Sequence, residues 1–164
     1  VAMLVADIPK PRKDKKQDRI DHDRIRHGEE GDRAGAEITG VDLSRLDSQQ
    51  VALLRSAYLE HQVIFFRDQN LTSRQYEDFA RHFGEAIRPK SNFMPVHEGS
   101  EIIAEVRKDE GMDRNIGGTW HTDQVFRTNP SWGTMLLCRE IPEHGGDTLW
   151  CSMTAAYERP SDGL

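Results

Sequence analysis

The sequence predicts an α+β protein with a β-sandwich or jelly-roll core. Two stretches with helical spacing of apolar side chains come early, at about residues 48–61 and 73–83. Short apolar runs, separated by turns that contain glycine and proline, follow them. Helices that precede a series of strands are typical of α+β domains, and many short strands favour a sandwich or a barrel. The 164 residues are enough for one domain or part of one.

Composition narrows the choice of partners and of cell compartment. The formal net charge is −6, so the basic face that nucleic-acid binding needs is not expected. No apolar run approaches the roughly 18 residues of a membrane span, and the first residues lack the features of a signal peptide. Two cysteines, Cys138 and Cys151, make no disulfide framework. We therefore expect a cytoplasmic protein that binds neither nucleic acid nor membrane.

The first 33 residues differ from the rest of the chain. Charged side chains of both signs dominate residues 10–33, and apolar side chains are few there. Such a segment buries too little apolar surface to offset the entropy that it loses on ordering. We therefore expect residues 1–33 to be a disordered charged leader, with the folded part of the chain beginning near Ala34.

Two capping boxes mark the starts of the expected helices. In such a box, the N-cap residue and a glutamine three positions later bond to each other's backbone N–H groups. One box pairs Asp47 with Gln50, and the other pairs Thr72 with Gln75. Apolar residues at helical spacing follow each box, and Gly84 marks the end of the second helix.

Strands are expected where apolar residues alternate with polar ones or form a short continuous run. A continuous run directly after the first helix predicts a strand that is buried on both faces. The expected strands cover residues 36–43, 63–66, 102–106, 119–126, 134–139 and 147–151. A short helix is expected after Ser152, which is a suitable N-cap.

The stretch Trp120-His121-Thr122-Asp123 lies within one of these expected strands. Side chains two residues apart in a strand point to the same face, roughly 6–7 Å apart along the backbone. One imidazole and one carboxylate on one face are suitable ligands for a divalent metal. A second histidine would complete the two-histidine, one-carboxylate triad of non-haem Fe(II) oxygenases. The same spacing also occurs at His27-Gly28-Glu29, and the alternative interpretation of His121 is a strand histidine bonded to a nearby acid.

Several short stretches together resemble one protein family. They are Gly40-Val41-Asp42-Leu43, His61-Gln62-Val63-Ile64-Phe65-Phe66-Arg67-Asp68-Gln69, Phe83-Gly84-Glu85, Trp120-His121-Thr122-Asp123, Gly145-Gly146-Asp147-Thr148-Leu149-Trp150 and Ala155-Ala156-Tyr157-Glu158. In this order and spacing they resemble the taurine dioxygenase (TauD/TfdA) family of Fe(II)/2-oxoglutarate-dependent oxygenases, which also includes aryloxyalkanoate dioxygenases. The resemblance implies a partial double-stranded β-helix, or jelly roll, with flanking helices.

The resemblance also implies the cofactors and their ligands. A member of this family requires Fe(II), 2-oxoglutarate as co-substrate and O2. His121 and Asp123 would be two of three protein ligands to iron, and Thr148 would bond through its hydroxyl to a carboxylate of 2-oxoglutarate. The enzyme would hydroxylate a substrate carbon and release succinate and CO2.

Substrate contacts are implied for three side chains, Asn92, Phe93 and Phe126. The expected substrate is a small organic acid of the sulfonate, sulfate ester or aryloxy and carboxylate type. Gly117 stands three residues before Trp120, where the taurine-specific member has an asparagine that contacts its substrate. Taurine itself is therefore not the expected substrate.

The last part of the family pattern is not found in this sequence. The family has its second iron histidine, and an arginine that pairs with 2-oxoglutarate, well beyond the position of Asp123, whereas this sequence ends at Leu164. His144 lacks the spacing of a substitute ligand. We therefore expect residues 34–164 to be the N-terminal part of a dioxygenase domain, a fragment that is inactive and binds iron weakly by itself. A homo-oligomer is expected for the full-length parent.

Two alternative functions stay open at this point. One is a non-catalytic remnant or pseudo-enzyme that acts only as a binding or structural module. The reading frame after Leu164 would distinguish it from an enzyme, because only an enzyme would continue to the expected histidine and arginine. The other is a zinc or manganese hydrolase that uses His121 and Asp123, and it needs further ligands that the sequence does not reveal.

Overall fold

The computed structural model divides the chain into two compact units. Val1–Asn70 and Gly133–Leu164 make up the first, named the sheet unit, and Leu71–Trp132 make up the second, named the loop unit. For residues 2–6 and 25–27 the structure describes the backbone. Backbone and side chains are described for residues 35–87, 94–109, 111–113, 116–142, 144, 146 and 148–158.

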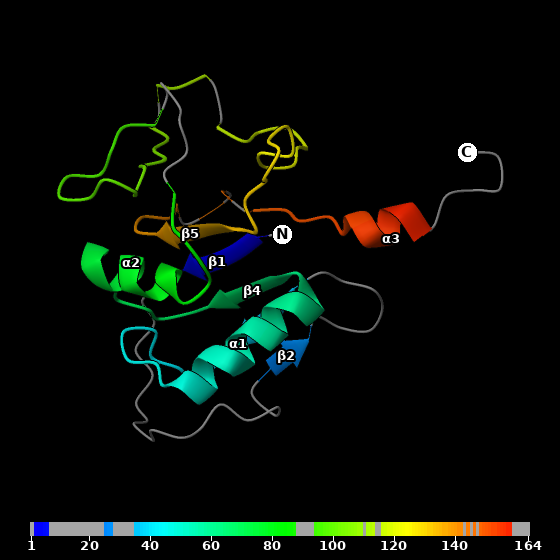
Figure 1. Cartoon of the computed structure of the whole chain (residues 1–164). Helices are drawn as coiled ribbons and strands as arrows, with labels where there is room; N and C mark the ends of the chain where they lie inside the picture. The colour runs from blue at the N-terminus through cyan, green and yellow to red at the C-terminus, as the bar shows by residue number, and fades with distance from the viewer. Residues whose placement is uncertain are drawn as a thin grey trace. The chain divides into compact units, whose positions relative to one another are not determined.

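The sheet unit contains a five-stranded sheet (Figure 1). In their spatial order, the strands are β2 (Ile25–His27), β3 (Ala36–Ile38), β4 (Val63–Phe66), β1 (Ala2–Ala6) and β5 (Thr134–Cys138). β1 is parallel to both β4 and β5, β3 is parallel to β4, and β2 pairs antiparallel with β3. β4 therefore has a neighbour on each edge. Val63, Ile64 and Phe66 are buried, so both faces of β4 carry buried side chains, as expected for a continuous apolar run.

Helix α1 (Ser48–His61) leads directly into β4 and packs beside it (Figure 1). Its capping box is formed, because the Gln50 N–H donates to Asp47 Oδ1 over 2.8 Å and the Asp47 N–H donates to Gln50 Oε1 over 3.0 Å. Gln62 then adopts a φ of 64°, which ends the helix and turns the chain into the strand. The buried apolar side chains of this unit are Ala36, Ile38, Val41, Leu43, Leu54, Ala57, Tyr58, Val63, Ile64 and Phe66.

A buried glutamine connects two loops of the sheet unit. Only 8% of Gln69 is exposed, and its Oε1 accepts a hydrogen bond from the Leu43 N–H over 3.0 Å. Its Nε2 donates to the carbonyl oxygens of Val41 over 3.0 Å and of Arg67 over 2.9 Å. One side-chain amide thus satisfies three backbone groups, which cost free energy when they are buried without a partner.

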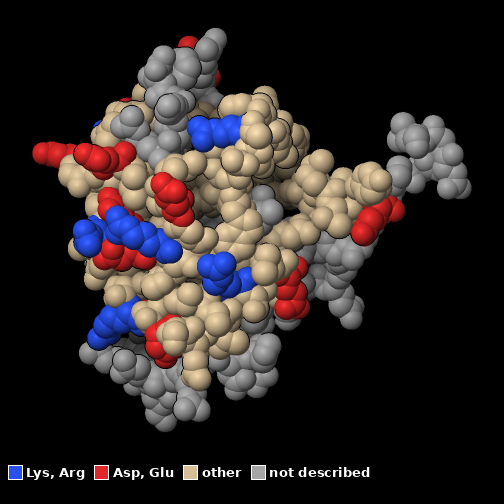
Figure 2. Space-filling view, viewed as in Figure 1, with Lys and Arg blue, Asp and Glu red and all other residues tan. Residues whose placement is uncertain are grey.

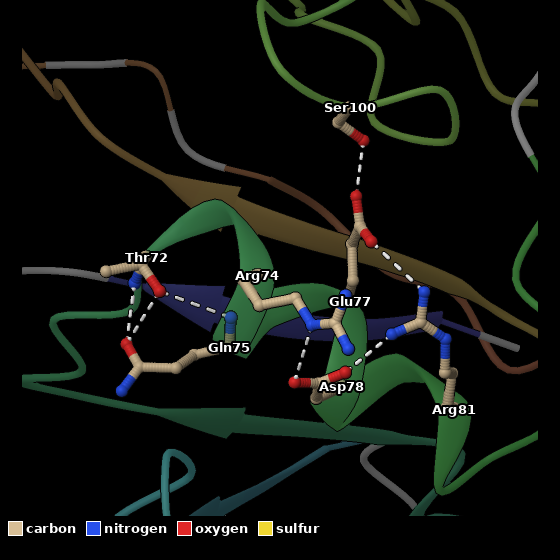
Figure 3. Close-up of polar contacts among 7 residues, drawn as sticks. All are labelled: Thr72, Arg74, Gln75, Glu77, Asp78, Arg81 and Ser100. Atoms are coloured by element: carbon tan, nitrogen blue, oxygen red, sulfur yellow. Dashed lines mark hydrogen bonds and ion pairs between the residues drawn. The ribbon is translucent and has the colours of Figure 1, made fainter.

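The loop unit contains helix α2 (Ser73–Arg81), which also begins with a capping box (Figure 3). The Thr72 N–H donates to Gln75 Oε1 over 2.9 Å, and the Gln75 N–H donates to Thr72 Oγ1 over 3.2 Å. Ion pairs along the helix join Arg74 to Asp78, Arg81 to Asp78 and Arg81 to Glu77. On the face drawn in Figure 2, basic and acidic side chains are likewise interspersed.

A loop of the same unit is bound to α2 through two side chains, His97 and Ser100. His97 lies between Ser73 Oγ, 2.8 Å from its Nε2, and Glu105 Oε1, 2.6 Å from its Nδ1. The Ser100 hydroxyl donates to Glu77 Oε1 over 2.6 Å (Figure 3), and this bond holds the pKa of Glu77 below its usual value. Ser73 and Glu77 are four residues apart, so both contacts fall on one face of α2.

The helices and two of the strands confirm the sequence-based expectations. α1 and α2 begin where the capping boxes predict, and β4 and β5 lie within the expected apolar runs. A short helix, α3 (Met153–Glu158), follows Ser152, whose Oγ accepts from the Ala155 N–H over 3.2 Å. β3 is shorter than expected, because Gly40 with a φ of 68° begins a turn. Among the described residues, no helix has the length and apolar character that crossing a membrane requires.

Three expected strands are wrong among the residues that the structure describes. They are residues 102–106, residues 119–126 and the described part of 147–151. The first contributes only one β-bridge, between Ala104 and Val96, and the other two form bends, turns or irregular backbone. An alternating pattern makes a strand only where a neighbouring segment supplies a continuous row of backbone hydrogen-bond partners. Around the bridge, the described residues provide two such bonds, from the Glu105 N–H to the Pro95 carbonyl oxygen and from the His97 N–H to the Ile103 carbonyl oxygen.

The described residues form an α+β arrangement around one small sheet, and the expected jelly roll is not seen within them. Two of the five strands, β1 and β2, come from residues 1–33, for which a charged leader is expected, and that expectation stays a prediction. Ala2–Ala6 is a continuous apolar run, and its backbone pairs with β4 on one edge and with β5 on the other. The other residues of 1–33 lie outside the described part of the chain.

Candidate metal centre

The segment that carries His121 and Asp123 is a bent loop and not the strand expected for residues 119–126. Backbone conformations with positive φ lie on both sides of the two residues, at Gly117 with a φ of 73° and at Gln124 with a φ of 53°. Extended backbone needs a strongly negative φ at every position. The two positive values therefore end the extended conformation before and after the pair.

His121 and Asp123 nevertheless lie together. His121 Nε2 is 3.3 Å from Asp123 Oδ1, and the two side chains are 53% and 49% exposed. In the expected strand they would have been roughly 6–7 Å apart along the backbone. The bend thus places a nitrogen and an oxygen donor close enough to contact one cation, with about half of each side chain open to solvent.

A backbone carbonyl group orients the imidazole of His121. The Thr119 carbonyl oxygen is 2.7 Å from Nδ1, and a carbonyl oxygen only accepts hydrogen bonds, so Nδ1 carries the hydrogen. In the neutral ring, the lone pair of Nε2 then faces the carboxylate of Asp123. Two lone-pair atoms at this distance repel each other unless a proton or a metal cation lies between them. One imidazole nitrogen with one carboxylate is also a donor set that fits Fe(II) and related divalent metals.

His121 and Asp123 are two candidate ligands for such a metal. No group of three or more histidine, cysteine, aspartate or glutamate side chains lies close enough together in the described part of the chain to hold a metal ion. His97, the histidine bound to α2, is already bonded to Ser73 and Glu105, and His144 belongs to the sheet unit.

The other predicted site residues lie in the sheet unit, on an exposed part of this loop or outside the described residues. Thr148 is exposed in a stretch without regular structure and belongs to the sheet unit, whereas the pair belongs to the loop unit. Phe126 is 85% exposed and follows Asp123 closely in the sequence. Asn92 and Phe93 lie outside the described residues. The roles of these four side chains stay predictions.

Sequence reasoning missed the groups that shape the site. The Thr119 carbonyl oxygen gives no signal in a sequence, because every residue has a carbonyl group. Gln124 gives no signal either, because glutamine rarely adopts a positive φ and nothing in its neighbours indicates it. Only Gly117 belongs to a residue type that favours such a conformation.

Comparison with known proteins gives a consistent result. The family model described as taurine catabolism dioxygenase TauD, TfdA family matches residues 25–164. An alkylsulfatase from Acinetobacter baylyi is 39% identical over 77% of this chain and 39% of its own length. An alpha-ketoglutarate-dependent sulfate ester dioxygenase from Pseudomonas putida is 36% identical over 80% of this chain and 43% of its own length.

The name of a third relative refers to a carboxylate and not to a sulfate ester. An (S)-phenoxypropionate/alpha-ketoglutarate-dioxygenase from Sphingobium herbicidovorans is 32% identical over 79% of this chain and 46% of its own length. The chain therefore spans less than half of the length of these curated relatives. The matched residues include His121, Asp123 and most of the described part of both units. On this evidence the chain belongs to the taurine catabolism dioxygenase TauD, TfdA family.

Proposed function

We propose that the whole protein is an Fe(II)/2-oxoglutarate-dependent dioxygenase that hydroxylates a small organic anion. The observation that carries the proposal is the His121–Asp123 pair, 3.3 Å apart, with the imidazole oriented by the Thr119 carbonyl oxygen. The family match supports it, and the names of two relatives refer directly to dependence on alpha-ketoglutarate, another name for 2-oxoglutarate.

Each chain residue has a defined task in this proposal. His121 Nε2 and an Asp123 oxygen hold the iron, and the Thr148 hydroxyl bonds to a carboxylate of 2-oxoglutarate. The third protein ligand, and the arginine for the far carboxylate of 2-oxoglutarate, come from residues outside these 164. Family membership also implies that the sheet of this chain is part of a larger jelly roll.

When bound, iron and 2-oxoglutarate supply the activation of O2, with one oxygen atom going to succinate and the other to a substrate carbon. The protein groups bind the metal and the co-substrates and orient them. His121 and Asp123 would hold the metal and leave room beside it for the keto-acid and O2. The half-exposed His121–Asp123 pair leaves this side of the site open for the co-substrates.

A sulfate ester is the substrate class that the observations favour. Two of the relatives named above are an alkylsulfatase and a sulfate ester dioxygenase. Three apolar side chains close in sequence to the His121–Asp123 pair, called the metal pair below, are largely exposed: Trp120, Val125 and Phe126. An exposed apolar surface suits an alkyl chain better than a small zwitterion such as taurine. Hydroxylation of the carbon next to the ester oxygen gives a product that breaks down to an aldehyde and inorganic sulfate.

Replacing a proposed iron ligand tests the reaction. In the whole protein, Asp123→Ala should abolish the succinate that forms from 2-oxoglutarate in the presence of an alkyl sulfate, because the carboxylate ligand is lost. Asp109→Ala is the matched control, since Asp109 is an exposed aspartate of the same unit that pairs with Arg107. Its succinate yield should equal that of the unchanged protein.

The same assay separates the alternatives. Alkyl sulfate should give more succinate than phenoxypropionate, and phenoxypropionate more than taurine. Retained turnover in Asp123→Ala would remove Asp123 from the iron site. A correctly folded whole protein that forms no succinate with any of the three compounds would favour a non-catalytic binding module.

A further inference from the structure

Gln124, the residue directly after Asp123, has an unusual backbone conformation. Its φ of 53° lies in the left-handed region, which residues other than glycine, asparagine and aspartate rarely adopt. Such a conformation persists only where surrounding contacts hold it, and residues of this kind are frequent at functional sites. Among the described residues, only Gln62 and Asp68 share this property without being glycine, and both lie in turns of the sheet unit.

Two hydrogen bonds hold Gln124 in place. The Arg127 N–H donates to its carbonyl oxygen over 3.1 Å and closes a turn. The Ser131 hydroxyl donates to its side-chain Oε1 over 2.7 Å, and this second bond is partly buried. Backbone and side chain of Gln124 are therefore both fixed to residues that follow the metal pair.

This arrangement bears directly on Asp123. On one side of the pair, the Thr119 carbonyl oxygen holds the imidazole of His121. On the other side, the peptide group between Asp123 and Gln124 can rotate if Gln124 relaxes to a negative φ. The carboxylate would then turn away from His121 Nε2, from which it is now 3.3 Å.

We propose that Gln124 and Ser131 are positioning residues that hold the Asp123 carboxylate in place for the metal. The proposal rests on the proposed function, because it takes His121 and Asp123 to be metal ligands. It goes beyond the proposed function because it attributes the position of the Asp123 carboxylate to the hydrogen bond between Ser131 and Gln124, two residues that are not proposed as metal ligands. Neither of them belongs to the stretches on which the family resemblance rests.

The test measures Mn(II) binding by the whole protein, from the loss of the electron paramagnetic resonance signal of free Mn(II). Ser131→Ala should weaken binding by about tenfold, the lower end of the usual effect of losing an outer-shell partner. Ser131→Thr keeps the hydroxyl group and should restore binding to within about twofold of the unchanged protein. The measured quantity is the affinity for Mn(II), so the test does not depend on catalytic activity.

Ser100→Ala is the matched control. Ser100 also donates its hydroxyl to a side chain of the loop unit, Glu77 Oε1 over 2.6 Å, but it has no link to the metal pair. Its loss should leave Mn(II) affinity unchanged. If Ser131→Ala and Ser100→Ala weaken binding equally, the effect is a general loosening of the unit, and the positioning role is overturned.

Variants of Gln124 test the backbone conformation itself. Gln124→Gly loses the anchor but adopts a positive φ without strain, whereas Gln124→Ala loses the anchor and keeps the strain. Mn(II) affinity should therefore decrease from the unchanged protein to Gln124→Gly and further to Gln124→Ala. Equal affinities for the two variants would overturn the positioning role of the turn.

Asp123→Ala separates this inference from the proposed function. If the unchanged protein binds Mn(II) no more tightly than Asp123→Ala, the ligand assignment fails, and the positioning role fails with it. If Asp123→Ala weakens binding but Ser131→Ala does not, the ligand assignment stands and the positioning role alone is overturned.

Discussion

Two regions of this chain are held in place by different forces. Residues 35–70 fold around buried apolar side chains, among them Phe66, which has no exposed surface. Residues 116–132 expose most of their large apolar side chains, including Trp120 and Phe126, at 71% and 85%. The first region therefore has a conformation that burial determines, whereas the second depends on a few polar links and on backbone torsions.

Two glutamines illustrate the difference. Gln69 in the first region is buried and bonds to three backbone groups, so its surroundings fix it from several sides. Gln124 in the second region has one side-chain partner, Ser131, and a strained backbone. A metal site placed on the second kind of structure can adjust when it binds its ligand, and it is also more easily disturbed.

The largest difference should appear between two phenylalanines. Phe66→Ala should lower the free energy of unfolding by about 3–5 kcal/mol, because it removes a ring from the core and leaves a cavity. Phe126→Ala should change it by about 0.5 kcal/mol or less, because the ring is already in water. Urea unfolding followed by circular dichroism measures both.

If Phe66→Ala does not fold, Phe66→Leu provides a milder comparison. It keeps an apolar side chain, although a smaller one, and should cost roughly 1–2 kcal/mol. Similar losses for the changes at Phe66 and Phe126 would contradict the distinction between a core held by burial and an exposed metal-ligand segment.

A smaller effect is expected for the buried glutamine. Gln69→Ala leaves the Leu43 N–H and the Val41 and Arg67 carbonyl groups without this partner, two of them in buried bonds. The loss should be about 2–3 kcal/mol in the free energy of unfolding, the upper part of the usual range for stranded buried polar groups. Gln49→Ala, an exposed change on α1, should stay within about 0.5 kcal/mol in the same urea titration. A loss at Gln69 no larger than at Gln49 would show that water replaces the amide.

The same distinction explains how much of the fold could be predicted from the sequence. Asp47 with Gln50, and Thr72 with Gln75, determine helix starts through contacts only three residues apart, and both were predicted correctly. β4 was predicted because its apolar run directly follows a helix. β1 was not predicted, because its pairing with β4 and β5 joins residues far apart in the sequence and the charged residues after it suggested disorder.

The candidate site was predicted in its residue types but not in its geometry. The His-x-Asp spacing identified His121 and Asp123, and the structure places them side by side. The expected strand was wrong, because the positive φ of Gln124 depends on Ser131, seven residues later, through a bond that no local pattern indicates. Local spacing can thus identify candidate ligands, while the torsions that bring them together depend on contacts along the loop.

The smallest expected effect concerns Asp42, an aspartate of the first region whose surroundings are polar. Its Oδ1 accepts from the hydroxyl and the N–H of Ser44, and its Oδ2 accepts from the side chain of Arg45. The Ser44 hydroxyl, with Arg45, holds the pKa of Asp42 below its ordinary value. Ionised Asp42 is therefore favoured in the folded state, so its contribution is present above about pH 4 and is lost as the pH falls through the lowered pKa.

Asp42→Asn tests this pH dependence. Half of the Asp42 side chain is exposed, so solvent screens the charge, and the variant should lose only about 0.5 kcal/mol at pH 6. The difference between the two proteins should be smaller at pH 2 than at pH 6, because the carboxylate of the unchanged chain takes up a proton as the pH falls through the lowered pKa of Asp42. Urea midpoints at both pH values measure it. Asparagine can still accept the hydrogen bonds of Ser44. A difference that stays constant from pH 6 to pH 2 would therefore mean that the charge of Asp42 does not contribute to the stability of this loop.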